Sequence, residues 1–226
     1  MKYFTQAYID FFSELENNNQ KAWFDENRKR YEKHVKEPFK AFINELIIKV
    51  QEFEPDLQVL AKDTIFRINR DIRFSKNKTP YKVHMAANLA RGGRKSYLPG
   101  YYIQLSASQV MLGGGVYFSS KEKNSLYKVR SEISYETEKF NQIVNAPAFK
   151  DTFGEVLGDK NKRLPSEFQD TLQEQPLIAN KQFYYMKKLD PQLITDENLV
   201  TTVADYLQVG APLNQFFKMA LEEIED

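Results

Sequence analysis

Apolar side chains change their spacing twice along this chain of 226 residues. In roughly the first fifty residues they recur every three or four positions, as the buried face of a helix requires, and Tyr8, Phe11, Phe12 and Leu15 form the first such set. In the middle, apolar runs are short and separated by polar or glycine links, as in strands. Helical spacing then returns. This order predicts an α+β fold with N-terminal helices, a central antiparallel sheet and C-terminal helices.

The first predicted strand, residues 66–74, carries apolar side chains at alternate positions, which places them on one face. Arg70 is the exception, because it falls on the apolar side. Gly92 and Gly93 mark a turn between two later segments, as in a meander of hairpins. The other predicted strands are residues 85–90, 101–105, 109–112 and 181–188.

Glycine and proline predict several local features. Gly113, Gly114 and Gly115 lack the spacing of a nucleotide-binding fingerprint, so we interpret them as a bulge or a close approach of two backbones. Near the C-terminus, Gly210 is predicted to end one helix in a left-handed conformation, and Pro212 to open the last one.

Composition excludes several classes of protein. Aromatic residues make up 14% of the chain, which argues against disorder, and no cysteine is available for disulfides, thiolate metal sites or nucleophilic catalysis. No apolar run approaches the ~20 residues that span a bilayer, and the N-terminus lacks the layout of a signal peptide. We see no repeat or linker. The sequence therefore predicts a cytoplasmic protein of one domain, residues 1–226, without a membrane segment.

Positive charge is concentrated in one segment, residues 66–82, which we call the basic segment. Its six basic residues and one acid give a local charge of +5, although the whole chain carries only +1. Arginine presents a planar fork of donors that suits carboxylate or phosphate. Because one carboxylate pairs well with at most two guanidinium groups, the surplus cations favour an anionic ligand. The basic residues are Arg67, Arg70, Arg73, Lys76, Lys78 and Lys82.

Arg70 is the residue that most favours a binding site. A buried guanidinium without a partner is costly, so we expect a carboxylate or a ligand beside it. The polar stretch 75–79 can offer backbone N–H groups to an anion, and Tyr81 can add a hydroxyl. The predicted ligand-binding residues are Arg67, Arg70, Arg73, Lys78, Tyr81, Lys82 and Arg130.

Three alternatives remain open at this stage. The basic segment is also compatible with an ordinary strand that has one solvated face, since lysines protect edge strands. It could dock an acidic partner protein as a scaffold module. Nucleic acid is the third option, with Tyr97, Tyr101 and Tyr102 stacking on bases; the low net charge disfavours it.

Catalytic candidates are few. Asp71 and His84 are the residues best placed to act as an acid or base, but no spacing in the sequence demands catalysis. His34 and His84 do not form a metal-binding cluster, so we predict neither a metal nor a cofactor. Arg130 can equally form a surface ion pair on its helix.

Two stretches of the sequence resemble the domain of unknown function 2461 family of bacterial and fungal proteins. The first runs from Leu15 through Trp23 and Phe24 to Pro38, and the second is the whole basic segment. Gly113, Gly114 and Gly115, with Val129 and Arg130, fit the same pattern. The resemblance implies the fold of that family and no particular activity. The expected function, binding of a small and possibly phosphorylated anion with or without catalysis, therefore depends on the residues themselves.

Overall fold

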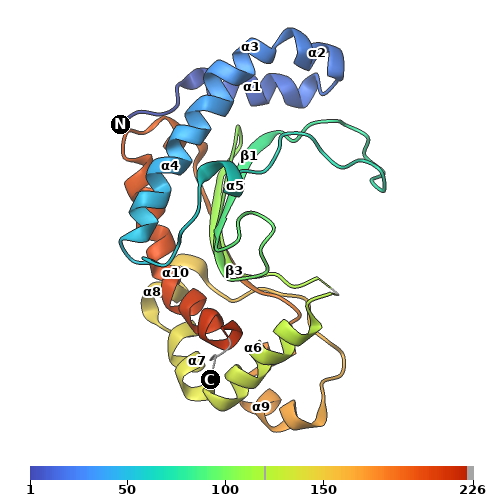
Figure 1. Ribbon diagram of the computed structural model, residues 1–226, viewed down its shortest axis with the longest axis vertical. Coiled ribbons are helices and arrows are strands. Elements are labelled where there is room, and N and C mark those ends of the chain that lie inside the picture. The colour runs from blue at the N-terminus through green and yellow to red at the C-terminus, as the bar shows by residue number, and fades with distance from the viewer. Residues whose placement is uncertain (120, 223–226) are drawn as a thin grey trace.

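The computed structural model describes residues 1–119 and 121–222, and a four-stranded antiparallel sheet lies at its centre (Figure 1). The spatial order of the strands is their order in the chain, so each pairs with the next. This confirms the α+β prediction. The strands are β1 (His84–Ala90), β2 (Gly100–Ser106), β3 (Val110–Val116) and β4 (Phe183–Leu189).

An N-terminal group of helices precedes the sheet. The apolar side chains that set the helical spacing are buried, and Tyr8, Phe11, Phe12 and Leu15 are fully enclosed. The chain passes without interruption from α3 through one π-helical stretch into α4. The elements are α1 (Gln6–Asn17), α2 (Lys21–Glu26), α3 (Arg28–Tyr31), η1 (Glu32–Lys36), α4 (Glu37–Gln51) and α5 (Ala61–Thr64).

A second group of helices follows β3 and surrounds β4 in the sequence. Its elements are α6 (Lys123–Tyr135), α7 (Thr137–Val144), α8 (Pro147–Phe153), η2 (Ser166–Phe168), α9 (Gln169–Glu174), η3 (Pro176–Ala179), η4 (Pro191–Thr195) and α10 (Leu199–Leu221). The expected break at Gly210 and Pro212 is wrong, because α10 runs through both. A side chain at Gly210 would lie 2.0 Å from the Tyr185 hydroxyl, so close packing against β4, not helix termination, requires this glycine.

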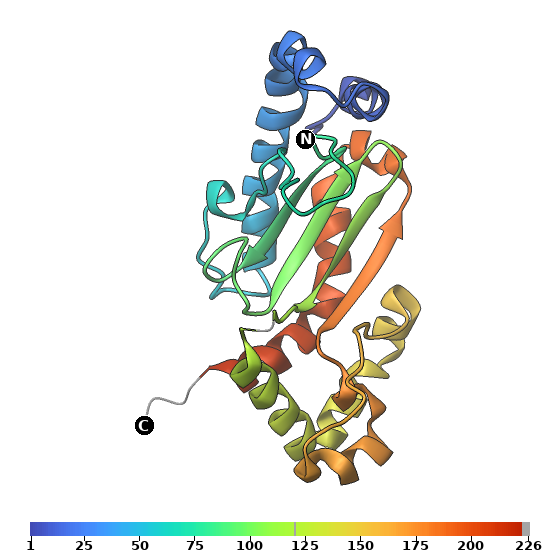
Figure 2. The ribbon, with the colours of Figure 1, turned by 90° about the vertical axis from the view of Figure 1, so that its right-hand side faces the viewer.

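The two faces of the sheet differ. Helices α4 and α10 pack on one face, over buried residues such as Ile103 and Leu112. The helix groups extend past both ends of the sheet and leave the middle of the other face uncovered, as Figure 2 shows. We call this the concave face. Its side chains are partly exposed and include Asn88, Tyr102, Gln104, Met111, Tyr184 and Met186.

The structure corrects the prediction of a strand over residues 66–74. The basic segment forms an irregular hairpin with an isolated bridge from Asn69 to Tyr81, and a second isolated bridge, from Ile65 to Ala87, lies just before it. Ile68 is buried as the alternation predicts, but Phe74 is 95% exposed. The alternation fails at the tip because the tip extends beyond the body of the protein and has no core to face (Figure 1).

The glycines of β3 are a site of close approach, as expected. An added side chain at Gly113 would lie 1.9 Å from the carbonyl oxygen of Tyr185 on β4. Gly115 adopts a φ of 113°, a conformation that other residues avoid. The β3–β4 pairing and the burial of Tyr185 beneath α10 therefore depend on the absence of side chains here.

Gly113→Ala should lower the free energy of unfolding by roughly 3 kcal/mol, because the new methyl group collides with backbone that cannot move aside. Gly154→Ala is the control, since Gly154 has φ 74° but nothing within 4 Å; it should lose only about 1 kcal/mol, from backbone strain alone. Urea denaturation of both variants tests this. Equal losses would contradict the crowding argument.

Candidate functional site

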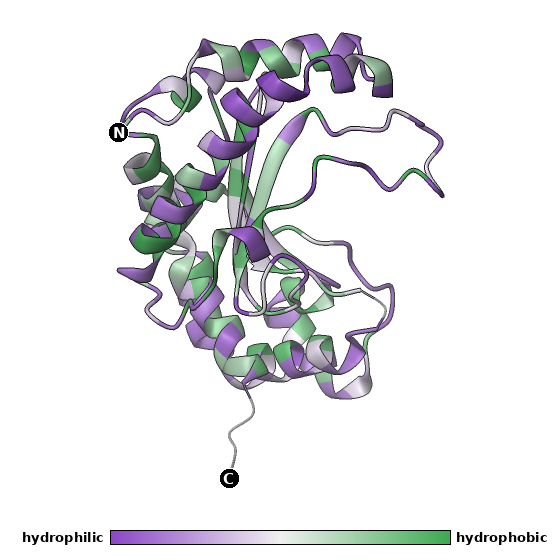
Figure 3. Ribbon diagram, turned by 45° about the horizontal axis from the view of Figure 1, so that its top comes forward, coloured by the Kyte–Doolittle hydropathy of each residue, from purple (hydrophilic) through white to green (hydrophobic). Residues whose placement is uncertain are grey.

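The basic segment protrudes from the body of the protein beneath α1 and α2 (Figure 1). Its outer part is mainly hydrophilic, as Figure 3 shows. Backbone hydrogen bonds join the two arms of the hairpin at its base: Arg70 N donates to Pro80 O, and Lys82 N donates to Ile68 O, each at 2.9 Å. Side-chain hydrogen bonds within the hairpin and an anchor from outside it complete its fixation.

Asn19, in the turn between α1 and α2, holds the hairpin as a neighbouring strand would. Its amide nitrogen donates to the carbonyl of Tyr81 at 2.9 Å, and its amide oxygen accepts from the Tyr81 N–H at 3.0 Å. The ring of Tyr81 stacks on Phe24 with centroids 4.1 Å apart. Tyr81 is therefore buried as an anchor. It also lines the hollow beside the hairpin, and its role as a hydroxyl donor to a ligand stays a prediction.

A hollow of about 310 Å³ lies between the hairpin, the α1–α2 turn and the start of β1. We call it the hairpin hollow. Two cations of the basic segment, Arg70 and Lys82, contribute to its wall, and one carboxylate, Glu16, faces the same space. Its lining residues are Glu16, Asn19, Arg70, Asn77, Thr79, Tyr81, Lys82, Val83 and His84.

Arg70 is half-buried inside the hairpin. Its guanidinium donates to the hydroxyl and the carbonyl oxygen of Thr79 and, at 3.4 Å, to the Ser75 hydroxyl. Among the described residues, no carboxylate lies within ion-pair distance of it, and its Nε makes no hydrogen bond. A guanidinium has five N–H donors, so Arg70 keeps both its charge and part of its donor capacity for a ligand.

Lys82 contributes the second cation. Its ammonium group donates to the carbonyl oxygen of Arg67 at 3.0 Å and lies 5.2 Å from the centre of the Phe66 ring. Burial, and then the positive charge of Arg67, lower the pKa of Lys82. An anion beside Lys82 would reverse this effect, since opposite charge favours the protonated amine.

His84 begins β1 at the inner end of the hairpin hollow. Burial, and then the charge of Lys82, lower the pKa of His84 to about 4. Its imidazole is therefore neutral at physiological pH, and one ring nitrogen can accept a hydrogen bond. Such a group is a weak base, so its position favours ligand contact over proton transfer.

The other predicted residues of the basic segment do not converge on the hollow. Arg73 pairs with Asp71 at 2.7 Å at the exposed tip, and hydrogen bonds from Arg73 lower the pKa of Asp71 to about 2. Lys78 donates to the carbonyl of Ile72 within the same tip. Arg67 is exposed and does not line the hollow. Asp71 thus remains ionised and lies outside the space where a ligand would meet Arg70.

Arg130 lies on α6, far from the hairpin (Figure 1). It is 5% exposed and donates to the carbonyl oxygens of Ile178, Ala179 and Asn180 at 2.9–3.5 Å. With the Asn161 amide oriented so that its oxygen faces Arg130, that oxygen accepts at 2.8 Å. The surface ion pair considered for Arg130 is therefore wrong, and the residue ties α6 to the segment before β4.

A second hollow, of about 370 Å³, opens on the concave face. We call it the sheet hollow. It contains residues that sequence reasoning missed, because strand alternation alone does not reveal which face of the sheet remains uncovered. Phe66 lines it, and the ammonium group of Lys82, a residue of the hairpin hollow, lies 5.2 Å from the centre of that ring. Its lining residues are Phe66, Asn88, Arg94, Lys95, Ser96, Leu98, Gly100, Tyr102, Gly114, Gly115, Val116, Tyr117, Tyr184 and Met186.

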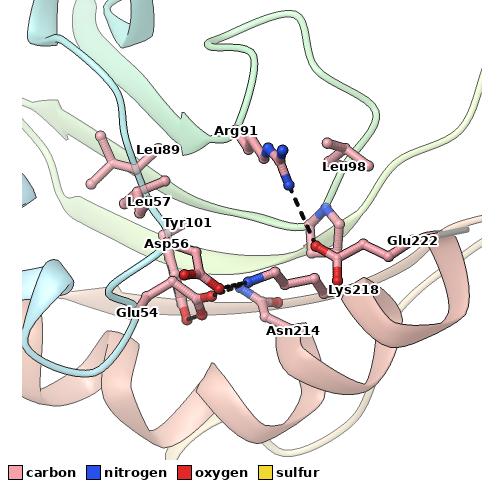
Figure 4. A pocket seen from close by; sticks show the side chains of 11 residues that line it. Glu54, Asp56, Leu57, Leu89, Arg91, Leu98, Tyr101, Asn214, Lys218 and Glu222 are labelled. Atoms are coloured by element: carbon pink, nitrogen blue, oxygen red, sulfur yellow. Dashed lines mark hydrogen bonds and ion pairs between the residues drawn. The ribbon is translucent and has the colours of Figure 1, made fainter. Parts of the chain in front are cut away.

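A third cavity, of about 60 Å³, lies between the α4–α5 connection and α10 (Figure 4). Lys218 reaches Glu54 at 3.4 Å and Asp56 at 2.7 Å, and the Tyr101 hydroxyl donates to Glu54 at 3.2 Å. Asn214 donates to the carbonyl of Gly100. These contacts tie α10 to the sheet, and they place Tyr101 on the covered face, where it cannot stack on a base.

A family model, described as conserved hypothetical protein (DUF2461), matches residues 7–216. The chain belongs to this family. No curated protein and no solved structure matches it significantly. The matched region of the DUF2461 protein contains the hairpin, both hollows and most of α10.

Two further observations concern the described part of this DUF2461 chain. No helix there combines the length and apolar character needed to cross a bilayer. Within the same residues, no three His, Asp or Glu side chains come together as a metal site would require.

Asn19→Ala should lower the free energy of unfolding of this DUF2461 protein by about 1–3 kcal/mol, because the backbone N–H and C=O of Tyr81 lose their partners. It should also speed tryptic cleavage within residues 66–82. Asn18→Ala is the control: its amide makes one exposed bond, to Glu14 O, so a change below about 0.5 kcal/mol is expected. Unchanged cleavage in Asn19→Ala would contradict the anchoring role.

We expect the free energy of unfolding to decrease in mild acid because His84 is protonated more readily in the unfolded chain. Its pKa is about 4 in the folded chain and about 6.5 when unfolded, so the unfolded state binds more protons between these values. The contribution of His84 to stability is thus present above pH 6.5 and is lost as the pH falls toward 4. It accounts for a decrease of roughly 1–2 kcal/mol in the free energy of unfolding from pH 7 to pH 5. Urea denaturation at the two pH values should show a smaller loss in His84→Gln, whereas His34→Gln should behave as wild type.

Proposed function

We propose that the hairpin hollow binds a small anionic ligand through Arg70 and Lys82. The observation that carries this proposal is that both cations line one hollow and that, among the described residues, neither is paired with a carboxylate. Arg70 offers directed donors and Lys82 a compact charge, which is a combination suited to phosphate.

The neutral groups around the cations complete the site. The amides of Asn19 and Asn77 and the hydroxyl of Thr79 lie in the same wall, although each already has a partner within the hairpin or its anchor. Neutral His84 adds a hydrogen-bonding group without competing charge. Glu16 is an exposed carboxylate in the wall of the hollow, so we expect the anion to meet Arg70 and Lys82 and to leave the Glu16 side free.

The same geometry supports binding more than catalysis. Of the two predicted acid–base candidates, Asp71 is held ionised by Arg73 at the tip, and His84 has a pKa too low for efficient proton transfer near pH 7. A reaction at this site would therefore need groups supplied by the ligand itself.

A partner protein is the second candidate, and one observation favours it. Phe74 is 95% exposed at the tip, with the Arg73 guanidinium 5.8 Å from its ring centre. An exposed aromatic beside cations is typical of a contact residue. In that case the functional residues would lie at the tip and not in the hairpin hollow.

Arg70→Met and Lys82→Met should each weaken the binding of inorganic phosphate at least about tenfold, since a charge-assisted hydrogen bond is worth roughly 1.5–3 kcal/mol. Isothermal titration calorimetry at low salt measures this. Arg73→Met is the matched control, because it removes an arginine of the same segment that lies at the tip. Equal weakening in all three variants would indicate a diffuse charge effect and would contradict the proposed site.

A further inference from the structure

The floor of the sheet hollow has no side chains at its centre. Gly100 of β2 and Gly115 of β3 are directly paired and lie on the concave face. Gly115 is required by its positive φ, and a side chain at Gly100 would come within 2.6 Å of Ala90 Cβ. Packing therefore demands both glycines, and as a consequence a flat area of backbone faces the hollow.

Aromatic rings surround this floor. Tyr184 is the strand partner of Gly115 on β4, and Tyr102 lies two positions from Gly100 on β2. Tyr117 stands at the rim, with its ring centre 6.1 Å from that of Tyr184, and Phe66 closes the side toward the hairpin. β2 and β4 are about 9.5 Å apart across β3, and a ring in contact needs about 3.5–4 Å on each side. A planar ring therefore fits between the aromatic walls.

One polar group in the sheet hollow favours a heterocycle over a plain hydrocarbon ring. The Asn88 amide lines the sheet hollow, and its oxygen lies 3.0 Å from the position that a Gly100 side chain would take. Within the described residues this amide makes no hydrogen bond. An asparagine amide pairs its donor and acceptor with the edge of a heterocycle, as it does with adenine.

The two hollows are neighbours. Lys82 lines the hairpin hollow while its ammonium lies over Phe66, which lines the sheet hollow. His84 and Asn88 project from the same face of β1, about 13 Å apart at the usual rise per residue. Arg94 and Lys95 also line the sheet hollow and add positive charge there. A ligand whose ring lies in the sheet hollow and whose anionic group lies in the hairpin hollow would pass beside Lys82.

We propose that the ligand of this protein is a nucleotide-like molecule, whose heterocycle occupies the sheet hollow and whose phosphates reach Arg70 and Lys82. The inference rests on the proposed function, because the phosphate end uses the same hairpin hollow. The volume of about 370 Å³ lies within the range of small-molecule sites, about 300–1,000 Å³. The low net charge of the chain favours a mononucleotide over a long nucleic acid.

The test compares inorganic phosphate, adenosine diphosphate and a single-stranded RNA oligomer by isothermal titration calorimetry. Adenosine diphosphate should bind at least about tenfold more tightly than phosphate, because stacking on an aromatic side chain adds roughly 5- to 150-fold. Tyr117→Ala should remove most of this gain. Tyr135→Ala is the matched control: both tyrosines are largely exposed, at 68% and 84%, but Tyr135 does not line the hollow.

Each outcome decides between the proposals. Equal affinities for phosphate and adenosine diphosphate, or a Tyr117→Ala variant that keeps the full gain, would overturn the nucleotide inference and leave the anion site standing. No binding of either molecule would overturn both. An RNA oligomer that binds far more tightly than the diphosphate, with a steep loss of affinity in salt, would replace the mononucleotide with single-stranded nucleic acid.

Discussion

The hairpin that carries the charge depends on one side chain from a distant part of the chain. Asn19 makes paired hydrogen bonds with the backbone of Tyr81, and Phe24 stacks on the Tyr81 ring. Without this anchor, only bonds at the base and within the hairpin itself would hold a segment of net charge +5. The anchor therefore fixes the position of Arg70 and Lys82 relative to the start of β1, and the hairpin hollow exists because of it.

Close backbone packing determines the other half of the candidate site. Tyr185 fills the space between β3 and α10, where Gly114 and Gly210 leave room for its ring and hydroxyl. The same absence of side chains continues onto the concave face at Gly115. Glycines thus allow α10 to pack tightly on one side of the sheet and leave the sheet hollow with an open floor on the other, next to a segment of concentrated positive charge.

Sequence patterns predicted the fold class and the basic segment, because apolar spacing and local charge are properties of neighbouring residues. They predicted a strand at 66–74 and a break near Gly210, because alternation and glycine were interpreted without the tertiary contacts that decide both. Arg130 was assigned to the same anion site as the hairpin, although it binds carbonyl groups beyond α6. Tyr184 and Asn88 carry no sequence signal for a site, since only the uncovered face of the sheet gives them access to a ligand.

A crystal structure determined in the presence of phosphate would locate the anion directly. We expect it in the hairpin hollow, within hydrogen-bond distance of the Arg70 guanidinium and the Lys82 ammonium, with the Asn19–Tyr81 bonds intact. An anion held instead at the exposed tip by Arg73 and Lys78, with water alone between Arg70 and Lys82, would contradict this expectation.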